Sequence, residues 1–181
     1  EGHSRIKKRV PRNSLALWNL GAKEQPILMH DGRISEAEIY DNGFNTPAEE
    51  WLPDGFNDLL AVQAIFPLIA QFEMAGNLNE NEVIGAVHDR IDYAWPIIAE
   101  RIRGIPEYRD LFVESFASIN EPSEISIVDV GNAIGAFVNQ QWRSYDSPFD
   151  DFLNGNSSAL TERQMMGLSL FYGKANCANC H

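Results

Sequence analysis

The last five residues of this 181-residue chain, Cys177-Ala178-Asn179-Cys180-His181, constrain its structure more than any other feature. They form a C-x-x-C-H motif, whose two thiols can add to the two vinyl groups of one porphyrin. The adjacent histidine then supplies an axial nitrogen ligand to the iron. The motif therefore predicts a covalently attached c-type haem held by Cys177, Cys180 and His181.

Two other kinds of site share part of this pattern. A thioredoxin-like C-x-x-C normally follows a strand of an α/β domain, which this sequence does not indicate. Half of a zinc site needs two further ligands at similar spacing. The other histidines, His3, His30 and His88, are too scattered to supply them naturally. Haem attachment is therefore the favoured interpretation.

The composition excludes some classes of function. The chain has 14 Lys and Arg against 26 Asp and Glu, a net charge of −12, so we expect no nucleic-acid partner. Such acidity favours a basic protein partner, although it more often serves solubility. The longest apolar run, Leu59 to Phe72, is too short to span a bilayer, so we expect no membrane span.

Helical signals run along most of the sequence and predict an all-α fold with long irregular loops, the longest over residues 21–57. A helix from Leu59 is expected to break at Pro67, which lacks a backbone N–H. Asn79 or Asn81 is expected to cap a second helix. Pro106 is typical of the first residue of another.

The clearest helix is expected to start at Ser123 or Ser126. Its apolar residues recur at intervals of three, four and seven, which places them on one face: Ile127, Val130, Ile134, Phe137 and Val138. A capping box at residues 161–164 predicts a last helix that stops at Gly173, just before the C-x-x-C-H motif.

Several short motifs, in this order and spacing, resemble those of the bacterial dihaem cytochrome c peroxidases and their MauG-like relatives. They are Arg12-Asn13-Ser14 with Leu17-Trp18-Asn19, Asp31-Gly32-Arg33, Gln63-Ala64 with Pro67 and Glu73-Met74, and Ser147-Pro148-Phe149-Asp150 with Gly155, Ala159-Leu160-Thr161, Gly167-Leu168 and Phe171. The sequence departs from the family pattern at Leu15, where proline is usual, at His30, where tryptophan is common, and at Phe66, where glycine is usual.

The resemblance implies cytochrome c-like helical haem domains and two covalent haems in the full protein. The chain would then be a fragment, with residues 1–145 belonging to the peroxidatic domain and residues 146–181 beginning the electron-transfer domain. The peroxidatic haem would use a first C-x-x-C-H before Glu1. The haem at His181 would transfer electrons, and its distal ligand would lie beyond the chain.

The resemblance also assigns a catalytic pair. Glu73, flanked by Phe72 and Met74, would move a proton between the peroxide oxygens, and Gln63 would offer an amide donor. Ten residues on an unbroken helix would separate them by roughly 15 Å and leave them on different faces, so convergence requires the break at Pro67. Without the resemblance, the sequence favours a surface position for Gln63 and a helix-end position for the Glu73 carboxylate.

Four further residues are candidate ligands or haem neighbours. His3 matches a histidine that ligates the resting peroxidatic iron in some family members, and a terminal histidine without this role is the alternative. His30 would lie between the haems, or be a histidine bonded to the backbone. Arg33 would pair with a haem propionate, or form a structural salt bridge. Asn13 matches a position that helps to bind calcium between the two domains.

The sequence therefore predicts part of a periplasmic peroxidase that reduces hydrogen peroxide with electrons from a small donor protein of the cytochrome c or cupredoxin type. A homodimer is an expected assembly. Two alternatives stay open. One is a MauG-like oxidase that acts on a protein or organic substrate, and the other is an electron-transfer module in which Glu73 and Gln63 are structural.

Overall fold

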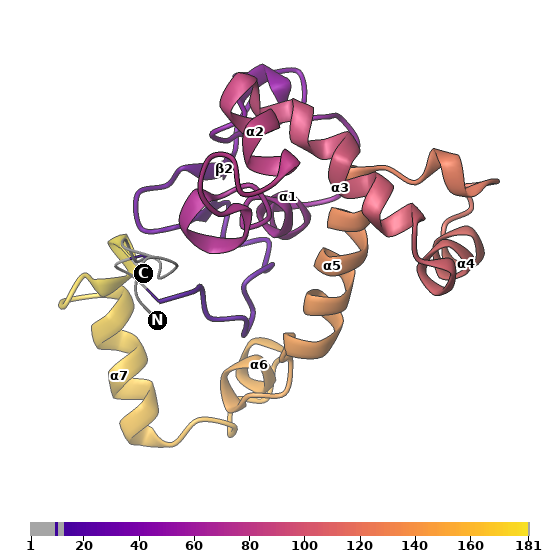
Figure 1. Ribbon diagram of the computed structural model, residues 1–181. Helices are drawn as coiled ribbons and strands as arrows, with labels where there is room; N and C mark the ends of the chain where they lie inside the picture. Colours follow the sequence, from indigo (N-terminus) through magenta and orange to yellow (C-terminus); the bar gives the residue numbers. More distant parts are fainter. Residues whose placement is uncertain (1–9, 11–12, 181) are drawn as a thin grey trace, which may run out of the picture. The chain divides into compact units, whose positions relative to one another are not determined.

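The structure, a computed structural model, describes residue 10 and residues 13–180. The chain divides into two compact units, unit 1 up to Arg143 and unit 2 from Ser144 (Figure 1). Unit 1 contains β1 (Ile27–Leu28), β2 (Ile34–Glu36), β3 (Phe44–Asn45), η1 (Glu49–Trp51), α1 (Leu59–Ile65), η2 (Gln71–Ala75), α2 (Glu82–Asp89), η3 (Ile91–Tyr93), α3 (Ala94–Arg103), α4 (Pro106–Ser115), η4 (Pro122–Glu124) and α5 (Ile127–Trp142). Unit 2 contains α6 (Pro148–Leu153), α7 (Glu162–Tyr172) and η5 (Cys177–Asn179).

The described chain is mostly helical, but the all-α prediction is wrong for residues 27–45. These residues form an antiparallel sheet in the order β1-β2-β3, with Ser35 opposite both Ile27 and Asn45. Strands of two or three residues are too short to show an alternating apolar pattern, so no strand could be predicted here. The turn between β2 and β3 includes Gly43, whose φ of 82° favours glycine.

Three helices start at capping residues that the sequence indicates, Asn81, Ser126 and Thr161. Each accepts a hydrogen bond from a backbone N–H in the first turn of its helix, and Asp58, which the sequence analysis did not single out, does the same for α1. Pro106 is the first residue of α4, as expected. These caps satisfy N–H groups that have no partner inside their own helix.

The core of unit 1 is built where α1 packs closely against α5. A Cβ atom added to Gly131 would lie 2.7 Å from the carbonyl oxygen of Ala61, and one at Gly135 would lie 2.9 Å from the Ala61 nitrogen. The two backbones therefore approach more closely than larger side chains would allow. Val62 and Ile65 of α1 are fully buried in this core, together with Ile34 of β2, which also packs on α1 (Figure 1).

The apolar face predicted for α5 is only partly covered in this chain. Ile127 and Val130 are buried, whereas Ile134 and Phe137 are 40% and 55% exposed. The exposed pair lines an apolar hollow of about 640 Å³ together with residues of α3 and α4. In the described part of the chain, no helix is both long enough and apolar enough to cross a membrane.

Candidate functional site

The two cysteines of the C-x-x-C-H motif lie in a single tight turn. Cys177 starts the 3₁₀ turn η5, which is closed by a hydrogen bond from the Cys180 N–H to the Cys177 carbonyl at 3.2 Å. Side chains three residues apart eclipse one another in a regular 3₁₀ helix, so a turn of this kind suits two thiols that must add to one porphyrin. Asn176 allows the chain to enter this turn from α7 by adopting a left-handed conformation, with φ 61°.

Unit 2 builds no core of its own in this structure. No side chain of residues 144–180 is fully buried. Several large apolar side chains are strongly exposed, among them Leu153, Met166, Leu170 and Tyr172. Both cysteines are free thiols, Cys177 half-buried and Cys180 exposed.

These observations fit a covalently bound porphyrin. Haem c needs two accessible thiols on one side of a turn, and a broad apolar ring needs uncovered apolar side chains to pack against. Cys177 and Cys180 would hold the group through thioether bonds. The predicted axial ligand, His181, lies outside the described residues, so its placement stays a prediction.

The second part of the site lies where α1 ends. The helix stops at Ile65, before Pro67, as the sequence predicts. The chain then folds back: the Met74 N–H donates to the Pro67 carbonyl at 3.2 Å, and Glu73 lies in the π-helical turn η2 between them. Gln63 is half-buried on α1. The break therefore returns the Glu73 turn to the end of the helix that carries Gln63.

The apolar surroundings expected for Glu73 are not formed by this chain. Glu73 is exposed, and its neighbours Phe72 and Met74 are also exposed, at 36% and 67%. The turn η2 buries only Ala75. The sequence indicated apolar neighbours correctly, but a five-residue π-helical turn on the surface directs them outward.

Asp31 holds the candidate propionate-binding residue, Arg33. The Arg33 Nε donates to Asp31 Oδ1 at 3.0 Å and its Nη2 donates to Oδ2 at 2.6 Å. The side-chain hydrogen bond from Arg33 is the main cause that lowers the pKa of Asp31 to about 2, and the charge of His30 lowers it further. In turn, the Asp31 hydrogen bond and the more distant charge of Glu73 raise the pKa of Arg33.

The structure thus brings His30, Asp31, Arg33 and Glu73 into one electrostatic neighbourhood. It arises because β1 and β2 both pack on α1, which places the turn between these strands near the chain that leaves the helix. Sequence reasoning assigned no role to Asp31. The sequence feature that could have indicated the pairing is the spacing of Asp31 and Arg33 on either side of Gly32. The φ of 68° at Gly32 turns the chain so that the two side chains meet.

His30 itself is exposed in the turn after β1. Asn13 is exposed in irregular chain, and no described contact draws it into this neighbourhood. His3 lies outside the described residues. Among the residues that the structure describes, no group of three or more His, Cys, Asp or Glu side chains is placed to hold a metal ion.

Comparison with known proteins shows which protein family the chain resembles. Residues 1–158 match the family model of the di-haem cytochrome c peroxidases. The chain is 35% identical to the cytochrome-c peroxidase IdrP2 of Pseudomonas sp. strain SCT over 85 residues, which are 47% of this chain and 22% of the relative. It is 32% identical to the methylamine utilization protein MauG of Methylorubrum extorquens over 134 residues, 74% of this chain and 31% of the relative.

A third relative is the cytochrome c551 peroxidase of Pseudomonas aeruginosa, 32% identical over 99 residues, which are 54% of this chain and 28% of the relative. The chain therefore spans less than a third of the length of each of these relatives. Because the family model matches most of its residues, the chain belongs to the di-haem cytochrome c peroxidase family. It is a peroxidase-like or MauG-like haem protein, as the motifs predicted.

Proposed function

We propose that this chain is part of a periplasmic dihaem enzyme that reduces hydrogen peroxide to water. Electrons would come from a small redox protein of the cytochrome c or cupredoxin type. Family membership and the accessible thiol pair support a haem enzyme. The observation that carries the catalytic assignment is the return of the Glu73 turn to Pro67, through the bond from Met74 to the Pro67 carbonyl.

In the proposed reaction, one peroxide, two electrons and two protons give two waters. When bound, haem c supplies the iron centres that carry the electrons and at which the O–O bond is cleaved. Cys177 and Cys180 would fix one haem covalently, with His181 as its axial ligand. A second haem would be held by other residues of the full-length protein, with His3 as a ligand in the resting state.

The chain's own contribution to catalysis is proton transfer. Glu73 would take a proton from one peroxide oxygen and deliver it to the other, so that the second oxygen leaves as water. The Gln63 amide would donate a hydrogen bond to the oxygen on which negative charge develops.

The other candidates would support these steps. His30, exposed beside Asp31, would lie on the electron route between the two haems. Arg33 would pair with a haem propionate while Asp31 keeps its guanidinium oriented. Asn13 would contribute to a calcium site whose other ligands come from the full-length protein, and the enzyme would be a homodimer.

Substitution of Glu73 tests this proposal. In the haem-loaded full-length protein, Glu73→Gln keeps the shape but removes the base, so we expect peroxide turnover to fall by about 10²–10⁴-fold. Glu114→Gln, on the exposed side of α4, is the matched control and should leave turnover unchanged. Unchanged turnover in Glu73→Gln with intact haem spectra would instead support a non-catalytic electron-transfer module.

A MauG-like oxidase is the second candidate, because the M. extorquens relative matches 74% of this chain. In that case peroxide would still react with the enzyme, but a protein or organic substrate would be oxidised. Product analysis separates the two enzymes. Stoichiometric oxidation of the donor protein supports the peroxidase, and oxidation of an organic substrate without donor turnover supports the oxidase.

A further inference from the structure

A hollow of about 510 Å³ lies on unit 1, and none of the residues assigned to haem and peroxide chemistry lines it. One wall is the end of the β2–β3 connection, residues 39–42, and the other is residues 50–54. The lining mixes apolar and aromatic side chains, including Ile39, Tyr40 and Trp51, with carboxylates. Ile39 is 67% exposed and Trp51 is 41% exposed.

Asn42 fixes the two walls against each other. Its side-chain Nδ2 donates to the carbonyl of Glu49 at 3.0 Å and to that of Leu52 at 3.3 Å. Its Oδ1 accepts from the Phe44 N–H at 3.0 Å. One amide side chain therefore joins the strand connection to both ends of η1, and the hollow is preformed rather than assembled by a ligand.

The hollow is strongly acidic. Three exposed carboxylates line it: Asp41, Glu50 and Asp54. The sequence contains no Lys or Arg between Arg33 and Arg90, although this stretch carries eleven Asp and Glu residues. The pKa of the Tyr40 hydroxyl is raised, first by burial and then by the charges of Glu49 and Glu50. A cation is thus favoured here and an anion is repelled.

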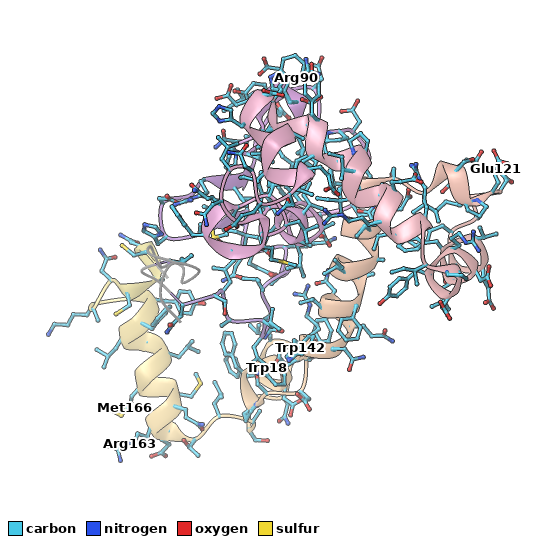
Figure 2. The ribbon with its side chains drawn as sticks, viewed as in Figure 1. Trp18, Arg90, Glu121, Trp142, Arg163 and Met166 are labelled. Atoms are coloured by element: carbon cyan, nitrogen blue, oxygen red, sulfur yellow. The ribbon has the colours of Figure 1, made fainter. Side chains whose placement is uncertain are left out.

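Trp51 already shows which cation suits this surface. The guanidinium of Arg90 lies 3.9 Å from the centre of the Trp51 ring and 4.3 Å from that of Tyr93. Asp92 holds the same guanidinium through bonds of 2.5 and 2.8 Å. Figure 2 shows Arg90 at the outer edge of unit 1. Arginine suits this kind of site because its planar guanidinium can stack on an aromatic ring and donate two hydrogen bonds to one carboxylate.

We propose that this hollow is a docking site for a basic partner protein, which inserts an arginine side chain against Trp51 and between Glu50 and Asp54. The inserted guanidinium would stack on the exposed part of the Trp51 ring, as Arg90 stacks on the part that it covers. Its charge would be shared by the three lining carboxylates. The site uses no haem residue, so the proposal does not depend on the peroxidase function.

The test is calorimetric titration of the haem-loaded full-length protein with a short peptide that carries one arginine between lysines. The matched probe replaces that arginine with citrulline, which has the same shape but no charge. We expect the citrulline peptide to bind about tenfold more weakly. Binding of the arginine peptide should also weaken as the salt concentration rises.

Protein variants locate the site. The double variant Glu50→Gln/Asp54→Asn keeps the side-chain shapes, and Trp51→Ala removes the ring; each should weaken arginine-peptide binding by about tenfold. Glu107→Gln/Glu114→Gln on α4 removes the same charge elsewhere and should bind like the parent protein. Circular dichroism confirms that each variant is folded. Because Trp51→Ala also frees Arg90, the charge variant decides the outcome if Trp51→Ala does not fold.

Three results would overturn the proposal: equal binding of the arginine and citrulline peptides, equal weakening by the hollow and α4 variants, or no binding at low salt. The second would show that the peptide senses only the net charge of −12. Loss of peroxide turnover has no bearing on any of these readouts, so failure of the docking proposal and failure of the proposed reaction are separable.

Discussion

The Asp31 carboxylate accepts two hydrogen bonds from the guanidinium of Arg33, at 3.0 Å from Nε and 2.6 Å from Nη2, across a single glycine. Gly32 makes this possible because its left-handed φ of 68° reverses the chain between the two side chains. The charge of Glu73 also contributes to raising the pKa of this guanidinium. A turn between two very short strands thereby fixes a cation whose charge interacts with that of the proposed proton-transferring carboxylate.

The Asp31 carboxylate should make the free energy of unfolding depend on pH in the acidic range. Its pKa is lowered from 3.8 to about 2 in the folded chain, so folding favours the ionised form. The stabilisation is fully present above pH 3.8 and is lost as the pH falls through about 2. Urea unfolding of the parent and of Asp31→Asn should therefore differ slightly at pH 5 and converge toward pH 2. A difference that grows on acidification would contradict this assignment.

Gly131 should be intolerant of even one added methyl group. A Cβ there would lie 2.7 Å from both the Ala61 carbonyl oxygen and a ring carbon of Phe56. Relieving this overlap would require the backbone of α1 to shift, which costs free energy. We expect Gly131→Ala to lower the free energy of unfolding by about 1–3 kcal/mol. Denaturant titration measures the change.

Gly85, within α2, is the matched control for this prediction. Nothing lies within 4 Å of an added Cβ at this position. Gly85→Ala should therefore raise the free energy of unfolding by about 0.5–1 kcal/mol through helix propensity. If both alanine variants were equally stable, the close approach of α1 and α5 would be wrong.

Asp58 links the start of α1 to α5. One carboxylate oxygen accepts from the Ala61 N–H at 2.8 Å, and the other accepts from Asn139 Nδ2 at 2.9 Å. Asp58→Ala should cost about 1–2 kcal/mol, mainly through loss of the helix cap. Asp58→Asn keeps a capping oxygen and should cost less.

Asn139→Ala completes a double-mutant cycle with Asp58→Ala, read by denaturant unfolding. The two changes should be less than additive because each removes the same hydrogen bond. Strict additivity would show that the contact between Asp58 and Asn139 contributes nothing to stability. Because α1 carries Gln63, we also expect Asp58→Ala to lower peroxide turnover in the full-length protein.

Local chemistry made the helices predictable. Ser126 and Asn81 cap where the sequence indicated, and Pro67 ends α1 because it lacks the N–H that a continuing helix needs. The sheet was missed because its strands are two or three residues long. The exposure of Phe137 could not be read from its spacing, because periodicity shows which residues share a face and not what covers that face.

The candidate site was predictable only in part. The C-x-x-C-H motif identifies its chemistry by residue type alone, and the tight turn at Cys177 agrees with it. The pairing of Asp31 with Arg33 depended on the backbone conformation of Gly32, which the sequence permits but does not specify. The π-helical turn that exposes Glu73 has no simple sequence pattern, so the exposure of Glu73 and of its neighbours Phe72 and Met74 could not be predicted.

The most direct test is a count of covalent haems in the full-length protein by intact mass and pyridine haemochrome spectrum, with and without Cys177→Ala/Cys180→Ala. We expect two haems per chain in the parent and one in the double variant. A single haem in the parent would leave no separate peroxidatic iron. Two haems retained in the variant would show that Cys177 and Cys180 hold none, and either result would contradict the assignment of a dihaem enzyme with one haem at these cysteines.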